Sequence, residues 1–200
     1  MNKSIGTKLF VFLLLLVSIP LILQSQVAKY HSSYFGVDFS ITASYEKNSK
    51  KNYITSIEVQ GDPDTPAYIL LNKKELYLFR ETLVKLKDKY IEWAQIATEN
   101  NVAEATKEIN VKLPSYTITW GNSRSWEAFG KLTPVFSVED GSATIILGEE
   151  VSALTNEYIR EAIYIVFANE ADFDSLYEAL NPDIIESYLQ NSSNTLELFK

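Results

Sequence analysis

The 200-residue chain contains no cysteine and a single histidine, His31. Without cysteine it cannot form a disulfide bond, a thiolate nucleophile or a zinc-finger site. One histidine excludes a histidine-rich metal centre, and a Ser-His-Asp triad would have to use this residue. Because His31 lies near the N-terminus, we expect it in an exposed tail, without a catalytic role.

Motifs for cofactor or phosphate binding are also missing. The sequence has no glycine-rich phosphate loop, nucleophile elbow or metalloprotease motif, so we expect no cofactor and no metal, and we favour a non-enzymatic protein. Carboxylates are plentiful, with adjacent pairs at Glu139-Asp140 and Glu149-Glu150. The alternative is therefore a carboxylate-dependent hydrolase acting on glycan or peptidoglycan, which needs two acids at a fixed separation.

The N-terminus has the pattern of a secretory signal. A basic start is followed by the apolar run Leu9–Leu23 and a polar exit. The run is shorter than the roughly 20 residues that a helix needs to cross a bilayer, and it contains Pro20. We predict a signal peptide over residues 1–25, cleaved after Ser25 or Gln26, and export to the periplasm or the extracellular space. An uncleaved membrane anchor is the alternative; after cleavage we expect no stable membrane span.

Charge is distributed unevenly along the chain. Residues 27–138 hold 14 basic and 13 acidic residues, whereas residues 139–200 hold 2 basic and 13 acidic residues, a net charge of −11. Such a surface disfavours nucleic acid and attracts cationic partners. A solvated, solubilising surface is the simpler explanation of the same pattern.

The stretch from Asn72 to Asn101 predicts one long helix, at about residues 73–100. Asn72 and Glu75 have the spacing of a capping box. Apolar residues recur at steps of three and four, the spacing of one buried helical face: Leu76, Phe79, Leu83, Leu86, Tyr90, Trp93 and Ala97.

Alternating apolar residues predict strands on both sides of this helix. Asp140-Gly141 is the strongest hairpin signal, and a two-residue turn there sets Val138 opposite Ala143 and Phe136 opposite Ile145. Other segments are expected as a helical turn at 102–108, a loop or short helix at 149–156, and a central strand at 159–168 that is covered on both faces.

These elements predict a single α+β domain over residues 27–190. We expect a mostly antiparallel sheet of about seven or eight strands, packed against the long helix, and a helical C-terminus built from segments 170–180 and 183–189. Residues 191–200 are expected to form a polar tail.

Two tryptophans, Trp120 and Trp126, are the most specific candidates for a binding surface. Side chains alternate across a strand, so a loop of two or four residues turns one indole outward, and a loop of three puts both on one face. With Tyr116 or Arg124, an exposed indole would make a platform for a sugar ring or a partner chain. Packing of both indoles in the core is the alternative.

Three segments resemble small exported proteins of gut Bacteroidetes: Lys89–Trp93, Val135–Gly141, and Asn156–Ile159 with Ile165–Phe167. The resemblance spans roughly residues 33–190. That family has no assigned activity, so the resemblance implies export from a bacterium and transfers no functional residue. Our leading hypothesis is an exported envelope domain that binds a cationic protein or a glycan.

Overall fold

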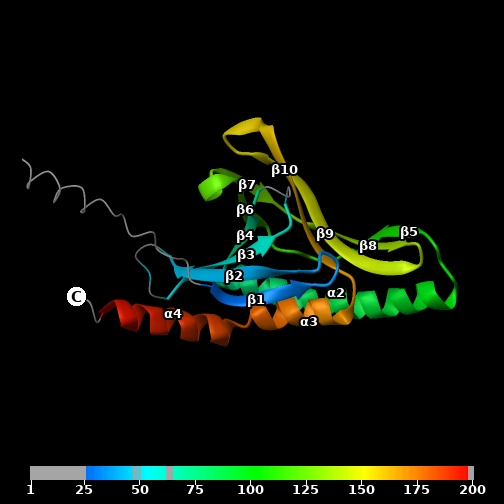
Figure 1. Ribbon diagram of the computed structural model, residues 1–200, viewed down its shortest axis with the longest axis horizontal. Coiled ribbons are helices and arrows are strands. Elements are labelled where there is room, and N and C mark those ends of the chain that lie inside the picture. The colour runs from blue at the N-terminus through cyan, green and yellow to red at the C-terminus, as the bar shows by residue number, and fades with distance from the viewer. Residues whose placement is uncertain (1–25, 47–48, 50, 62–64, 198–200) are drawn as a thin grey trace, which may run out of the picture.

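The computed structural model describes residues 26–46, 49, 51–61 and 65–197, so the predicted signal peptide lies outside the described residues. The described chain forms ten strands in two antiparallel sheets, together with a long helix and a helical C-terminus (Figure 1). The predicted α+β class is confirmed. The strands divide between two sheets, where we expected about seven or eight in one.

The larger sheet has six strands in the order β1-β2-β3-β4-β6-β7. One row of isoleucines, Ile41, Ile57, Ile69 and Ile118, crosses four neighbouring strands in register, and each is fully buried. Their shared face is the apolar face that the alternating sequence pattern predicts. The strands are β1 (Gln26–Ser32), β2 (Val37–Tyr45), β3 (Tyr53–Val59), β4 (Ala67–Asn72), β6 (Tyr116–Trp120) and β7 (Trp126–Gly130).

The smaller sheet has four strands in the order β10-β9-β8-β5. The predicted hairpin is confirmed, because Val138 lies opposite Ala143 and Phe136 opposite Ile145. Asp140 and Gly141 both have positive φ, +48° and +76°, as a two-residue turn of this type requires. The strands are β5 (Ala105–Glu108), β8 (Thr133–Glu139), β9 (Ser142–Ala153) and β10 (Asn156–Phe167).

Three sequence predictions in this sheet are wrong. The expected helical turn at 102–108 contains β5, and the expected loop or short helix at 149–156 is mostly a continuation of β9. The strand at 159–168, β10, is an edge strand. Its apolar residues are nevertheless buried near the end of the strand, where Ile165 is 3% and Val166 5% exposed on opposite faces. The backbone of Tyr164 also exchanges two hydrogen bonds with Gln60, which follows β3, and this bridge ties the edge to the larger sheet.

The long helix α2 (Lys73–Glu99) supports both sheets. Asn72 and Glu75 form the predicted capping box. The ring of Phe79 packs edge-on against Tyr116 of β6, and the ring of Trp93 packs edge-on against Phe136 of β8. The first half of α2 therefore lies under the larger sheet and the second half under the smaller one, as Figure 1 shows.

Two further helices, α3 (Glu170–Ala179) and α4 (Pro182–Glu197), follow β10. Phe173 of α3 stacks on Phe167 at a centroid distance of 4.0 Å, which fixes α3 to the end of β10. The helix α4 continues to Glu197, through residues that we expected in a polar tail. Within the described residues, none of the helices is both long enough and apolar enough to cross a membrane.

The expectation for His31 is partly wrong. It lies within β1 and not in a tail, although its side chain is 53% exposed. Its Nδ1 is 2.9 Å from Asp38 Oδ1, and its backbone N–H donates to the hydroxyl of Ser175. This residue therefore helps to join β1, β2 and α3.

Candidate functional site

The predicted aromatic platform is largely inside the protein. Trp120 lies directly opposite Trp126, so both indoles share one face of the sheet. Trp120 and Tyr116 are each 2% exposed, and burial raises the pKa of the Tyr116 hydroxyl well above its ordinary value. These two rings contribute to the core and present no surface to a ligand.

The other two predicted residues, Trp126 and Arg124, are half-buried. Trp126 packs against the core, and the guanidinium of Arg124 lies over the ring of Tyr68 at 4.0 Å from its centroid. Such a stacked cation stabilises the turn between β6 and β7. The structure thus does not gather the four predicted residues on one surface, and ligand binding at this turn stays a prediction.

Many acids of the C-terminal third form contacts within the protein. Asp174 of α3 pairs with Lys87 of α2 at 2.8 Å, and Glu186 of α4 pairs with Lys73 at 2.7 Å. Asp172 is 3% exposed and accepts backbone N–H groups of Ser33 and Ala168. Part of the local acidic surplus therefore fastens α3 and α4 to the rest of the fold.

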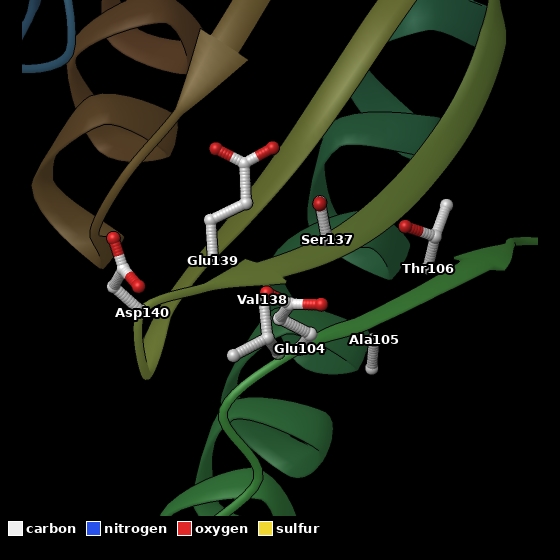
Figure 2. Close-up of a pocket in the computed structure, with 7 residues that line it drawn as sticks. All are labelled: Glu104, Ala105, Thr106, Ser137, Val138, Glu139 and Asp140. Carbon is white, nitrogen blue, oxygen red and sulfur yellow. The ribbon is translucent and has the colours of Figure 1, made fainter.

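A different group of acids surrounds a hollow at the far end of α2. The hollow has a volume of about 570 Å³ and lies where β5 and the β8–β9 turn meet (Figure 2). We call it the acidic hollow, and its lining residues are Glu104, Ala105, Thr106, Ser137, Val138, Glu139 and Asp140.

The pairing of β5 with β8 brings these residues together. Thr106 lies opposite Ser137. Continuing the same antiparallel register by one more pair sets Glu104 opposite Glu139 on the same face of the sheet. In Figure 2 the Ser137 hydroxyl and the Glu139 carboxylate point to the same side of β8. Two carboxylates and two hydroxyls therefore share one small area.

The Ser137 side chain lines the hollow between the two acidic positions. The residue as a whole is 8% exposed, and its hydroxyl is not one of the buried polar atoms that lack a hydrogen-bond partner. A hydroxyl that borders a hollow can donate one hydrogen bond and accept others, so it can contact a bound polar group.

The other acidic pair, Glu149-Glu150, is divided between two environments. Glu149 accepts a hydrogen bond from the backbone N–H of Lys131 at 2.6 Å, and burial raises the pKa of its carboxyl, although that bond lowers it. Glu150 is exposed and pairs with Arg160 at 3.0 Å. Adjacent strand residues point to opposite faces, so these acids do not face each other as a hydrolase pair would.

Sequence reasoning identified Glu139-Asp140 but missed Glu104, Thr106 and Ser137. The signal that would have found them is the alternation Glu104, Thr106, Glu108, which we interpreted as part of a helical turn. As a strand, the same residues place two acids and a hydroxyl on one face.

The chemistry of the acidic hollow favours a cation. Among the residues that the structure describes, no group of three or more His, Asp or Glu residues has the arrangement of a metal site. Carboxylates and hydroxyls suit a basic group that donates several hydrogen bonds, such as an ammonium or a guanidinium.

Comparisons with protein-family models, with curated proteins and with solved structures find no match for this chain.

Proposed function

We propose that this protein is an exported, non-enzymatic binding domain that holds a basic group of a partner protein in the acidic hollow. The observation that carries the proposal is the arrangement of Glu104, Glu139 and Asp140 around one hollow that the hydroxyls of Thr106 and Ser137 also line. All three acids are exposed and so can be reached by a partner.

Electrostatics favours an occupant with positive charge. Like charges at opposite positions of two strands destabilise their pairing, and Glu104 and Glu139 occupy such positions. No lysine or arginine is among the described residues that line the hollow. A bound ammonium or guanidinium would remove this repulsion and would donate to carboxylates and hydroxyl together.

The lining also favours a cationic protein over a glycan. Sugar rings usually bind against an exposed aromatic side chain, and the described lining contains none. Of the two partner classes that the sequence suggested, the basic protein therefore fits the hollow better.

Binding is tested with fluorescein-labelled pentalysine, whose anisotropy is followed during titration with the protein. We expect the variant Glu104→Gln/Glu139→Gln/Asp140→Asn to bind about tenfold more weakly at low salt. The estimate assigns about 0.5 kcal/mol to each exposed charge pair, and about 1.4 kcal/mol corresponds to tenfold. Asparagine tolerates the positive φ of residue 140, so the turn should persist.

The matched control changes the same number of charges elsewhere, as Glu127→Gln/Glu157→Gln/Glu178→Gln. These glutamates are exposed and lie outside the hollow. We expect the control to keep most of the affinity, since its charges are distant and screened by salt. Equal losses in both variants, or no binding by the unmodified protein, would contradict the proposal.

Export is tested separately, by expression of the full chain in a bacterium with an export pathway and N-terminal sequencing of the recovered protein. A first residue of Gln26 or Val27 is expected, because cleavage is predicted after Ser25 or Gln26. Recovered protein that retains Met1 would contradict cleavage, and recovery only in the cytoplasm would contradict export.

A further inference from the structure

The strand β5 forms one edge of the smaller sheet. It pairs with β8 on one side, and no described strand pairs with it on the other. All of its residues, Ala105 to Glu108, are exposed. An edge of this kind presents backbone N–H and C=O groups that another chain can bind.

The register shows which backbone groups point away from β8. The N–H of Ile109 donates to the carbonyl of Pro134 at 2.8 Å, so these opposite residues form a hydrogen-bonded pair. In an antiparallel ladder such pairs alternate with non-bonded ones, so Lys107 and Ala105 also bond to β8. The N–H and C=O groups of Thr106 and Glu108 therefore point to the free edge.

The same residues carry the charge of that edge. The side chains of Glu104, Thr106 and Glu108 alternate onto the face that bears Ser137 and Glu139. A strand added beside β5 would place every second side chain next to this face, within reach of an opposite or diagonal acid. The edge therefore selects for basic residues at alternate positions.

We propose that the partner binds as an extended peptide, which adds a fifth strand to the smaller sheet along β5. This inference rests on the proposed function and specifies how the basic group reaches the hollow. The peptide runs antiparallel to β5, with one basic residue opposite Glu108 and a second, four positions later, opposite Glu104. Its backbone supplies affinity, and its two basic side chains supply selectivity.

Acidic edges also keep copies of this protein apart. Two β5 strands brought together would oppose glutamates to glutamates, which is unfavourable, whereas a basic segment meets the opposite charge. The edge is thus protected against self-pairing and remains open to a basic chain.

The decisive protein variant is Thr106→Pro. Proline at this position removes the one outward N–H of residue 106 and leaves the bonds between β5 and β8 intact, as is tolerated on edge strands. All the acids of the hollow remain. The matched control is Thr106→Val, which also loses the hydroxyl but keeps the N–H.

The probe is the labelled peptide acetyl-Lys-Thr-Thr-Val-Lys-amide, in which the lysines are four positions apart. We expect Thr106→Pro to weaken its binding about fivefold or more, because a bond is lost and the added ring obstructs the edge. Thr106→Val should stay within about twofold, since its backbone is unchanged. In the complex, the amide protons of Thr106 and Glu108 should exchange more slowly with solvent.

A second peptide distinguishes the two proposals. It is identical except for a methyl group on the nitrogen of its central threonine, which prevents pairing with Thr106 and leaves the charges unchanged. Weaker binding of the methylated peptide supports strand addition. Equal binding of both peptides overturns strand addition and leaves cation recognition standing, whereas binding of neither peptide overturns the proposed function as well.

Discussion

The two halves of α2 differ in how deeply they are buried. In the first half, the large apolar residues Leu76, Phe79, Leu83 and Leu86 are at most 1% exposed. In the second half only Ala97 is buried, and Tyr90 and Trp93 are partly covered. One helix thus forms the centre of the core at one end and a support for an exposed sheet at the other.

The difference follows from what covers each half. The first half lies under the six-stranded sheet, where Phe79 meets Tyr116. The second half extends under the narrow four-stranded sheet, where the stripe residues Tyr90 and Trp93 are only partly buried. Fewer buried side chains mean lower local stability, so we expect the acidic hollow to lie on the less stable part of the molecule. Binding surfaces are commonly found on such parts.

The largest effect that we expect is the difference between Phe79→Ala and Trp93→Ala in how far each lowers the free energy of unfolding. Removal of the fully buried Phe79 ring should lower the free energy of unfolding by about 3–5 kcal/mol, since it leaves a cavity in the core. Trp93 is partly exposed, with Lys107 over its ring at 4.5 Å, and its removal should cost about half as much or less.

Urea unfolding followed by circular dichroism gives both values. If Trp93→Ala destabilises the protein as much as Phe79→Ala, the two halves of α2 are equally important and the contrast between them is wrong.

A smaller effect distinguishes the two ends of α2. Asn72 begins the helix by accepting the N–H of Glu75 at 3.0 Å, so Asn72→Ala should cost about 1 kcal/mol. Asn100, at the other end, donates to the carbonyl of Ile96 in an exposed position, so Asn100→Ala should cost about 0.5 kcal/mol or less.

Thermal unfolding of the two single variants beside the unmodified protein measures this difference. A larger loss at Asn100 than at Asn72 would show that the distal end is held more tightly than its burial indicates.

The smallest effect concerns Glu149, at the point where β9 leaves β8. Burial raises the pKa of this carboxyl, so the folded protein binds its proton more tightly than the unfolded chain does. The protonated Glu149 carboxyl therefore contributes fully to the stability of the protein at acidic pH, and its contribution falls as pH rises through the raised pKa. Glu149→Gln keeps an acceptor for the N–H of Lys131 but has no carboxyl that ionises. The variant therefore does not lose this part of its stability as pH rises.

We expect the melting temperature of Glu149→Gln, relative to the unmodified protein, to rise between about pH 4 and about pH 7. Glu150→Gln serves as the control, because it loses an exposed ion pair with Arg160 and should show no such gain. A relative melting temperature of Glu149→Gln that falls with pH would contradict the assigned environment.

Local patterns predicted the elements that depend on neighbouring residues. The capping box at Asn72 and Glu75 and the apolar spacing of three and four placed α2 to within a residue or two of its ends. Asp140-Gly141 placed the β8–β9 hairpin in the correct register, since a two-residue turn leaves only one pairing that keeps Phe136 and Ile145 on the same face.

Patterns failed where the partner of a segment is distant in the sequence. Residues 105–108 have no apolar alternation, and they form a strand only because β8 is available beside them. The same dependence hid Glu104, Thr106 and Ser137 as neighbours. For Trp120 and Trp126 the unknown quantity was the length of the loop, which decides whether the two indoles share a face.

The sequence by itself determined the α+β class, the long amphipathic helix, the hairpin and the acidic surplus, because spacing and turn chemistry act over a few residues. Only the tertiary structure decided that the strands divide into two sheets, that the tryptophans lie inside or against the core, and that Glu104 lies opposite Glu139. These outcomes depend on which distant strands pair, and pairing is set by the packing of whole faces against α2.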